Sequence, residues 1–210
     1  MTNRLSDLFQ KYPALRDCEK ELAAALHILI STFEQGNKLL VCGNGGSAAD
    51  SEHIVAELMK GFMRPRRIPE TDADKLNNTA GATGREVADK LQSALPAISL
   101  VSQASLISAV ANDTSAEMVF AQQVYGLGKP GDALLAITTS GNSRNVINAV
   151  VVAKSFGLKS VALTGRSGGA IAPMADVAIR VGADSVADIQ ELHVPVYHWL
   201  CLETEAKFFA

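Results

Sequence analysis

Two segments of the chain combine glycines with short polar side chains in a pattern that suits anion binding. Residues 41–47 read Val-Cys-Gly-Asn-Gly-Gly-Ser, and residues 138–143 read Thr-Thr-Ser-Gly-Asn-Ser. Each segment lies between an apolar run and a helical pattern, where glycines allow close backbone approach and a helix N-terminus offers free N–H groups. Neither has the ending of a P-loop or the third glycine of a dinucleotide fingerprint, which favours a phosphate without its nucleotide. The alternative is that Ser47 and Ser143 cap their helices.

A second set of polar side chains contains histidine and carboxylate. His53 and Glu57 are four residues apart and therefore share one helix face just after the first loop. The C-terminal segment supplies a further cluster, made of Gln190, Glu191, His193 and His198. Imidazole and carboxylate together suit a divalent metal such as zinc, and they equally suit proton transfer near neutral pH. The alternative for His53 and Glu57 is a solvated pair on an exposed helix.

The elements that position these residues follow from the alternation of apolar runs with helical patterns. We expect buried strands at 38–42, 97–101, 133–138, 160–164 and 177–181. Runs that are apolar on both faces predict a five-stranded parallel sheet covered by helices on each side. The fold class is therefore α/β, a three-layer, doubly wound domain spanning residues 1–210, with ligands at the carboxyl ends of the strands.

Helices are expected at both ends of the domain. In the N-terminal helical segment, 1–36, an apolar stripe at steps of three and four predicts one long helix that ends at Gly36, with His27 as a structural residue. The stripe consists of Leu15, Cys18, Leu22, Leu26, Leu29 and Phe33. A closing helix is expected over 185–206, kinked at Pro195 because proline lacks a backbone donor.

One stretch interrupts this alternation. Residues 64–93 are polar and rich in Thr, Asn, Asp and Gly, and Val87, Leu91 and Leu95 predict one short helix there. A connection of this length in a compact domain is typically functional or disordered. We therefore interpret 64–95 as an inserted segment that is either disordered, a lid over the ligand, or an arm that covers a subunit interface.

Composition and charge exclude several classes of function. The 210 residues carry 19 basic and 22 acidic side chains, a formal net charge of −3, which argues against nucleic acid as a partner. No apolar run approaches the roughly 20 residues needed to cross a bilayer, and the first residues do not read as a leader. We expect a cytoplasmic protein without membrane contact, with Cys18, Cys42 and Cys201 as reduced core thiols.

Taken together, these motifs resemble those of the phosphoheptose isomerases in the sugar isomerase (SIS) family. The resemblance runs in order from about residue 36 to the C-terminal helix. It rests on Cys42-Gly43-Asn44-Gly45-Gly46-Ser47, His53 with Glu57, Asn112-Asp113, Thr138-Thr139-Ser140-Gly141-Asn142-Ser143, Leu163-Thr164-Gly165, and Ile189-Gln190-Glu191-Leu192-His193 through His198. It implies the SIS fold, a flavodoxin-like doubly wound sheet.

The resemblance also implies an activity, a cofactor and an assembly. Such enzymes interconvert sedoheptulose 7-phosphate and D-glycero-D-manno-heptose 7-phosphate, supplying nucleotide-activated heptose for lipopolysaccharide or other surface glycans. They are homotetramers with sites at subunit interfaces and one zinc ion per subunit. By matched position, the catalytic residues are Glu57 and His198, and the metal ligands are His53, Glu57, Gln190 and His198. The substrate-binding residues are Asn44, Gly45, Gly46, Ser47, Glu57, Asn112, Asp113, Thr138, Thr139, Ser140, Ser143 and Gln190.

Spacing adds a hypothesis about the metal site. Gln190 and His198 are eight residues apart, roughly 12 Å of rise along a straight helix, which is too far for both to meet one ion easily. Either the kink at Pro195 brings them closer, or one ligand comes from a neighbouring subunit. The chain also departs from the family at Asp188, where arginine is usual.

Two alternative functions remain on the sequence alone. SIS-family adaptors related to the replication-initiation regulator DiaA are not enzymes and lack the acidic residue that matches Glu57; its presence here favours an enzyme. An isomerase of another sugar phosphate is the other alternative, because the phosphate loops do not read sugar length.

Overall fold

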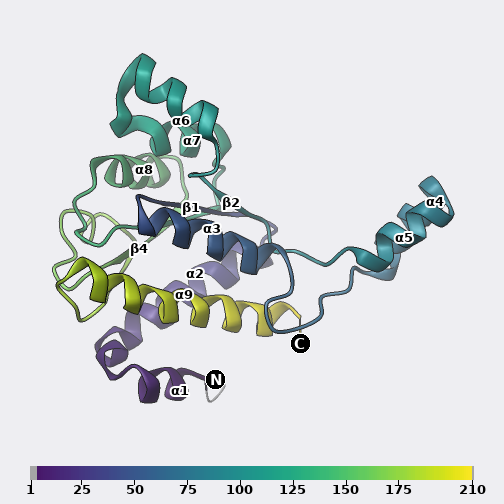
Figure 1. Ribbon diagram of the computed structural model, residues 1–210, viewed down its shortest axis with the longest axis horizontal. Helices are drawn as coiled ribbons and strands as arrows, with labels where there is room; N and C mark the ends of the chain where they lie inside the picture. The colour runs from purple at the N-terminus through teal and green to yellow at the C-terminus, as the bar shows by residue number, and fades with distance from the viewer. Residues whose placement is uncertain (1–3, 210) are drawn as a thin grey trace.

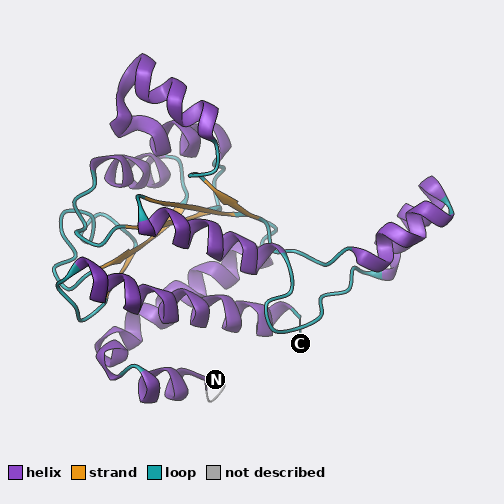
Figure 2. Cartoon of the chain, viewed as in Figure 1, coloured by secondary structure: helices purple, strands orange, loops and turns teal. Residues whose placement is uncertain are grey.

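The structure is a computed structural model that describes residues 4–209, so residues 1–3 of the expected N-terminal segment and residue 210 lie outside it. Five strands form one parallel sheet in the order β2-β1-β3-β4-β5 (Figure 2). They span β1 Leu39–Gly43, β2 Ala97–Ser99, β3 Ala133–Ile137, β4 Lys159–Thr164 and β5 Val177–Arg180. The predicted α/β fold, its parallel sheet and its flavodoxin-like strand order are confirmed.

Alternating strand residues face two separate cores, which is why the strands read as continuous apolar runs. Leu39 and Val41 pack against one set of helices, and Leu40 and Cys42 pack against the other. The first set is α2 Glu19–Glu34, α3 Gly46–Met59 and α9 Val186–Phe208; the second is α6 Ala104–Val110, α7 Val119–Leu127 and α8 Arg144–Ser155 (Figure 1). The two sets form the outer layers of the predicted three-layer sandwich.

The N-terminal segment differs from the single long helix that the sequence predicts. A short helix, α1 Arg4–Lys11, comes first, a 3₁₀ turn spans Pro13–Cys18, and α2 then runs from Glu19 to Glu34. Pro13 separates the two helices because proline starts a turn readily but does not continue a helix. The residues Leu15, Cys18, Leu22 and Leu29 of the predicted stripe are buried as expected.

The predictions for 64–95 are partly wrong. The segment holds two helices rather than one, α4 Glu70–Ala80 and α5 Ala82–Lys90, and Leu91 and Leu95 lie beyond the second. The two helices meet where Gly84 faces the Leu76 carbonyl, and Gly84 is their one buried residue. They form an ordered hairpin that projects away from the sheet (Figure 1). We call α4, α5 and their turn the arm. Only one of its two helices was predicted from the sequence, because the segment contains few apolar residues.

The C-terminal helix is longer than predicted and is capped at its start. The Ser185 hydroxyl accepts the Asp188 N–H, and α9 continues as one helix through the buried Pro195 to Phe208. Cys18, Cys42 and Cys201 are free and buried, as predicted. Across residues 4–209, none of the helices is long and apolar enough to cross a membrane.

Candidate active site

The glycine loop lies between β1 and α3 and is built for close contact with α9. Gly45 has φ +56°, a conformation that side chains other than glycine rarely adopt, and it precedes the first residue of α3. Gly46 faces the side-chain amide of Gln190, and a Cβ atom there would overlap that amide. The chain therefore brings Gln190 next to Gly45 and Gly46, as expected if they share a ligand.

The hydroxyl loop, residues 138–143, lies beside the glycine loop because β3 is the neighbour of β1. Asn44 of the glycine loop and Asn145, in the first turn of α8 just after the hydroxyl loop, form a reciprocal pair of amide hydrogen bonds, each 2.9 Å long. The loop is braced from the other side, where the Gly165 N–H donates to the Thr139 carbonyl and the Ile171 N–H to the Gly141 carbonyl. Its conformation is thus set by contacts within the chain.

The side chains of the two serines in these loops do not cap their helices, so the capping alternative is wrong. Gly45 is the N-cap residue of α3, and Ser47 lies buried in the first turn of that helix. Ser143 is the N-cap residue of α8, but its side chain makes no cap hydrogen bond and instead lies 3.1 Å from the Thr138 hydroxyl. A pair of hydroxyls at a helix N-terminus suits an anion.

A hollow of about 240 Å³ opens beside the hydroxyl loop, and its lining includes a cationic side chain. Thr139, Ser140 and Arg166 contribute to its lining. The Arg166 guanidinium donates to Asp184 at 3.1 Å and to the Gly182 carbonyl. A larger hollow of about 620 Å³, lined by Lys20, Glu21 and residues near β5, contains none of the predicted site residues.

His53, Glu57 and His198 come together on the adjoining faces of α3 and α9. The His53 Nε2 atom lies 3.2 Å from the Glu57 Oε1 atom, and the rings of His53 and His198 are 5.0 Å apart between centroids. The Lys60 ammonium donates to the other Glu57 oxygen at 3.1 Å. Glu57 is largely covered, with 12% of its side chain exposed, whereas His53 keeps 43%. His53 is therefore partly solvated, as the solvated-pair alternative expects, but Glu57 is not.

Two further side chains orient His53, and the sequence analysis missed both. The Tyr197 hydroxyl lies 3.0 Å from His53 Nδ1 and donates to Asp50 at 3.3 Å. Burial raises the pKa of the Asp50 carboxyl, although the Tyr197 hydroxyl and the charge of His53 oppose that effect. Asp50 is three residues before His53, so helical spacing offered a signal for it, whereas Tyr197 is 144 residues away and offered none.

His198 and His193 differ in their burial and in their place in the site. Burial and the neighbouring charge of His53 lower the pKa of His198, with Glu57 acting in the opposite direction. A neutral His198 is able to accept a proton near pH 7. His193 is fully buried, and that burial lowers its pKa to about 4, so it belongs to the core and not to a cluster with Gln190 and His198. Glu191 is exposed.

The predicted zinc ligands fit the metal in chemistry, but only three of the four adjoin one another within this chain. The buried Nε2 atom of His198 has no hydrogen-bond partner, as suits a ligand atom. His53 and Glu57 contact each other directly and His198 lies beside His53, whereas Gln190 lies against Gly46 near the start of α9. No three His, Cys, Asp or Glu side chains within 4–209 are arranged to hold a metal ion.

Asn112 and Asp113 lie in a single turn of π-helix, Ala111–Ser115, which follows α6. Such turns occur often at functional sites. Both side chains are exposed, and the Asn112 amide donates to the Asp113 carboxylate at 2.8 Å. Their hydrogen bonds among the described residues do not connect them to the two loops.

Asp188, at the position where the resemblance implies arginine, has contacts that explain its local role. Its carboxylate accepts the Ser185 hydroxyl at 2.7 Å, and its N–H donates back to that hydroxyl at 3.2 Å. A carboxylate in the first turn of a helix is also favoured by the helix dipole. Asp188 therefore stabilises the start of α9.

Comparison with known proteins agrees with this geometry. The SIS domain family model matches residues 10–73 and 86–165, which leaves out most of the arm. A phosphoheptose isomerase of Akkermansia muciniphila is 35% identical over 207 residues, 99% of this chain and 96% of that protein. The phosphoheptose isomerase GmhA from Neisseria gonorrhoeae superposes with a TM-score of 0.71 at 33% identity, covering 96% of this chain and 98% of that one. A phosphoheptose isomerase from Francisella tularensis gives 0.73 at 32%, covering 98% and 100%.

Proposed function

This chain belongs to the SIS-domain family of phosphoheptose isomerases, and on that premise we propose that it interconverts sedoheptulose 7-phosphate and D-glycero-D-manno-heptose 7-phosphate. The observation that carries the proposal is the placement of Glu57 between His53 and Lys60, with His198 beside His53. A carboxylate and an imidazole are sufficient for the proton transfers of an aldose–ketose isomerisation.

In the proposed mechanism, the two loops hold the substrate and the facing helices move its protons. Thr138, Thr139, Ser140 and Ser143 bind the phosphate, which positions the reacting carbons at the far end of the sugar. One of Glu57 and His198 removes the proton from the carbon next to the carbonyl, which forms an enediol. Protonation of the neighbouring carbon then completes the exchange of aldose and ketose, with the partner residue handling the proton on the oxygens.

The sugar itself is assigned to the backbone and amides near the glycine loop. Asn44, Gly45, Gly46, Ser47 and Gln190 would contact the sugar, together with Glu57 and the pair Asn112 and Asp113. The first five lie near one another at the carboxyl end of β1, where open parallel sheets bind ligands. The exposed positions of Asn112 and Asp113 leave them free to reach a sugar.

We propose one zinc ion per subunit, held by His53, Glu57, Gln190 and His198. When bound, such an ion polarises the oxygens of the reacting carbons. Of the two explanations for the spacing of Gln190 and His198, a ligand from a neighbouring subunit is the better supported. The reason is that Gln190 is engaged at Gly46, about two turns of α3 before His53.

The proposed assembly is a homotetramer with sites at subunit interfaces, and the arm is the segment that we assign to an interface. It projects away from the sheet and does not cover its own site as a lid would (Figure 1). Its helices contain 11 and 9 residues and bury only Gly84, whereas isolated helices shorter than about 12–15 residues are marginal in water. Packing against another subunit would supply the missing burial. Supply of heptose for surface glycans and a cytoplasmic location complete the proposal.

The test is turnover of a panel of sugar phosphates by the purified, zinc-supplemented protein. We expect conversion of sedoheptulose 7-phosphate, followed by NMR, to exceed that of shorter ketose phosphates. Faster turnover of another sugar would favour that isomerase activity. Binding of sugar phosphates without any turnover would favour the adaptor alternative.

A further inference from the structure

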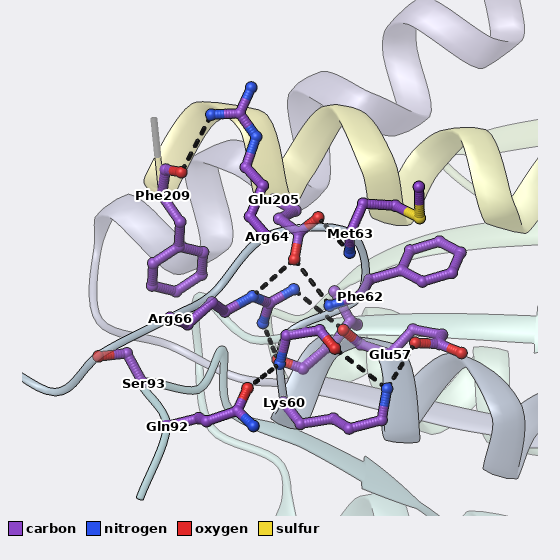
Figure 3. Close-up of polar contacts among 12 residues, drawn as sticks. Glu57, Lys60, Phe62, Met63, Arg64, Arg66, Gln92, Ser93, Glu205 and Phe209 are labelled. Atoms are coloured by element: carbon purple, nitrogen blue, oxygen red, sulfur yellow. Dashed lines mark hydrogen bonds and ion pairs between the residues drawn. The ribbon is translucent and has the colours of Figure 1, made fainter. Parts of the chain in front are cut away.

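The turn that follows α3 is anchored by a buried ion pair outside the residues assigned so far. Arg66 donates from Nε to Glu205 Oε1 at 2.9 Å, and the side chains of both residues are at most 2% exposed (Figure 3). Glu205 also accepts the backbone N–H groups of Phe62 at 2.8 Å and Met63 at 2.9 Å. The Phe209 ring covers the guanidinium at 4.5 Å. Each charged group is therefore paired and satisfied within the protein interior.

Arg66 uses its other two nitrogens to hold the end of α3. Nη2 donates to the Glu57 carbonyl at 3.0 Å, and Nη1 donates to the Leu58 carbonyl at 2.7 Å. The last four carbonyls of a helix have no partner within the helix, and a cation there is favoured by the helix dipole. The backbone of Glu57, the residue proposed to move protons, is thus bonded directly to Arg66.

The same turn also fixes one side of the Glu57 carboxylate. Lys60 donates to Glu57 Oε2 and to the Gly61 carbonyl, both at 3.1 Å. The Gly61 N–H donates to the Gln92 side chain at 2.7 Å, and the next two N–H groups bind Glu205. Figure 3 shows Glu57, Lys60, Arg66 and Glu205 around this one turn. A shift of the turn would therefore move Glu57 through both its backbone and its carboxylate.

We propose that Arg66 and Glu205 are positioning residues for the isomerisation, acting by holding Glu57 at the reacting carbons. The inference rests on the proposed function, since it assigns to Glu57 the proton transfer named there. The pair does not contact the Glu57 carboxylate itself, so its effect reaches the chemistry only through the turn 60–66 and the end of α3. Displacement of a reactive group by about 1 Å can cost about 100-fold in rate.

Asp132 is a matched control residue, because it lies at the opposite end of the sheet from the two loops. It is as buried as Glu205, accepts the N–H groups of Lys38 and Lys129, and forms an ion pair with the Lys38 ammonium. It precedes β3, at the amino end of the sheet, whereas the two loops lie at the carboxyl end. Loss of its charge removes a similar set of contacts without touching the turn after α3.

The experiment compares Glu205→Gln and Arg66→Lys with Asp132→Asn in the full-length protein. Urea unfolding gives the stability of each variant, and steady-state kinetics are measured where every variant is folded. We expect all three to be destabilised, with kcat lowered roughly 10- to 100-fold only in Glu205→Gln and Arg66→Lys, and KM within about threefold of the native value.

Two results would overturn the proposal. One is native kcat in Glu205→Gln despite lower stability; the other is an equal loss of kcat in Asp132→Asn, which would indicate a general structural effect. If Arg66→Lys does not fold, the isosteric Glu205→Gln decides alone. If the native protein shows no turnover at all, the proposed function itself is contradicted. If Glu205→Gln turns over as fast as the native protein, only the positioning role is contradicted.

Discussion

The candidate site has two halves, the loops that follow β1 and β3 and the adjoining faces of α3 and α9. They differ in how many of their polar groups are already held by contacts within the chain. In the loop half, Asn44 of the glycine loop is bonded to Asn145 at the start of α8, directly after the hydroxyl loop, and Gln190 is packed against Gly46. In the helix half, His53, Glu57 and His198 adjoin one another, but the buried Nε2 atom of His198 has no hydrogen-bond partner among the described residues. His53 remains 43% exposed.

From this difference we infer that folding of one chain forms the binding groups and that assembly completes the groups that transfer protons. Binding of a phosphate needs N–H and hydroxyl groups held in place, and local loop contacts are enough to hold them. Proton transfer needs side chains from distant elements in a covered site, and we propose that a second subunit supplies that cover and one of the metal ligands. On this proposal, a single chain forms the binding half, and the assembled protein completes the half that moves protons.

The largest expected effect comes from Glu57→Gln, which changes only the helix half. We expect kcat to fall roughly 10²- to 10⁴-fold because the carboxylate no longer takes or gives a proton. Phosphate-end binding should persist, because the loops are unchanged. Steady-state kinetics and calorimetric titration with the sugar phosphate measure the two effects separately. Retention of turnover would remove Glu57 from the mechanism.

Removal of the arm should also affect the helix half more than the loops. Arg67 and Gln92 form an antiparallel bridge at the base of the arm, so residues 69–90 are replaceable by Asn-Gly, a favoured two-residue hairpin turn. We expect a smaller assembly by light scattering and at least roughly tenfold lower turnover, since an incomplete site loses orientation. An assembly of native size with full turnover would show that the arm has no interface role.

Gly46→Ala tests the loop half. The added Cβ would overlap the Gln190 amide, so we expect a raised KM and a loss of about 1–3 kcal/mol in the free energy of unfolding. Gly126→Ala in α7 is the control, because a Cβ there meets no atom within 4 Å. Alanine at that helical position should be neutral or stabilising. Equal behaviour of the two variants would contradict the close packing of Gln190 on the glycine loop.

A smaller effect concerns acid stability of the turn beneath Glu57. Burial raises the pKa of Glu205, but the N–H groups of Met63 and Phe62 and the Arg66 guanidinium outweigh it and hold that pKa below its ordinary value. Its contribution to stability is therefore present above the pKa of the unfolded state and is lost as the pH falls through the folded value. Unfolding of Glu205→Gln should depend less on pH than native unfolding on the acid side of about pH 4.3. Parallel curves would be inconsistent with an ionised Glu205.

The sequence predicted those parts of the fold and site whose signal is local. Apolar runs gave the strands, and the glycine and hydroxyl loops were recognisable because each is a contiguous segment at a strand end. Contacts between distant residues were missed, such as Tyr197 with His53 and Arg66 with Glu205. In 64–95 only one of the two helices of the arm was predicted: Leu76, Val87 and a few alanines are the main apolar residues of the arm, so it lacks the periodic stripe that marks a helix.

The most direct test of the account is isotope exchange at the reacting carbon in deuterated water. The native, zinc-supplemented protein and Glu57→Gln are incubated with sedoheptulose 7-phosphate, and deuterium next to the carbonyl is followed by NMR. The account predicts heptose phosphate carrying deuterium in the native reaction, and product formation slowed roughly 10²- to 10⁴-fold in Glu57→Gln. Product and exchange at native rates in Glu57→Gln would contradict it.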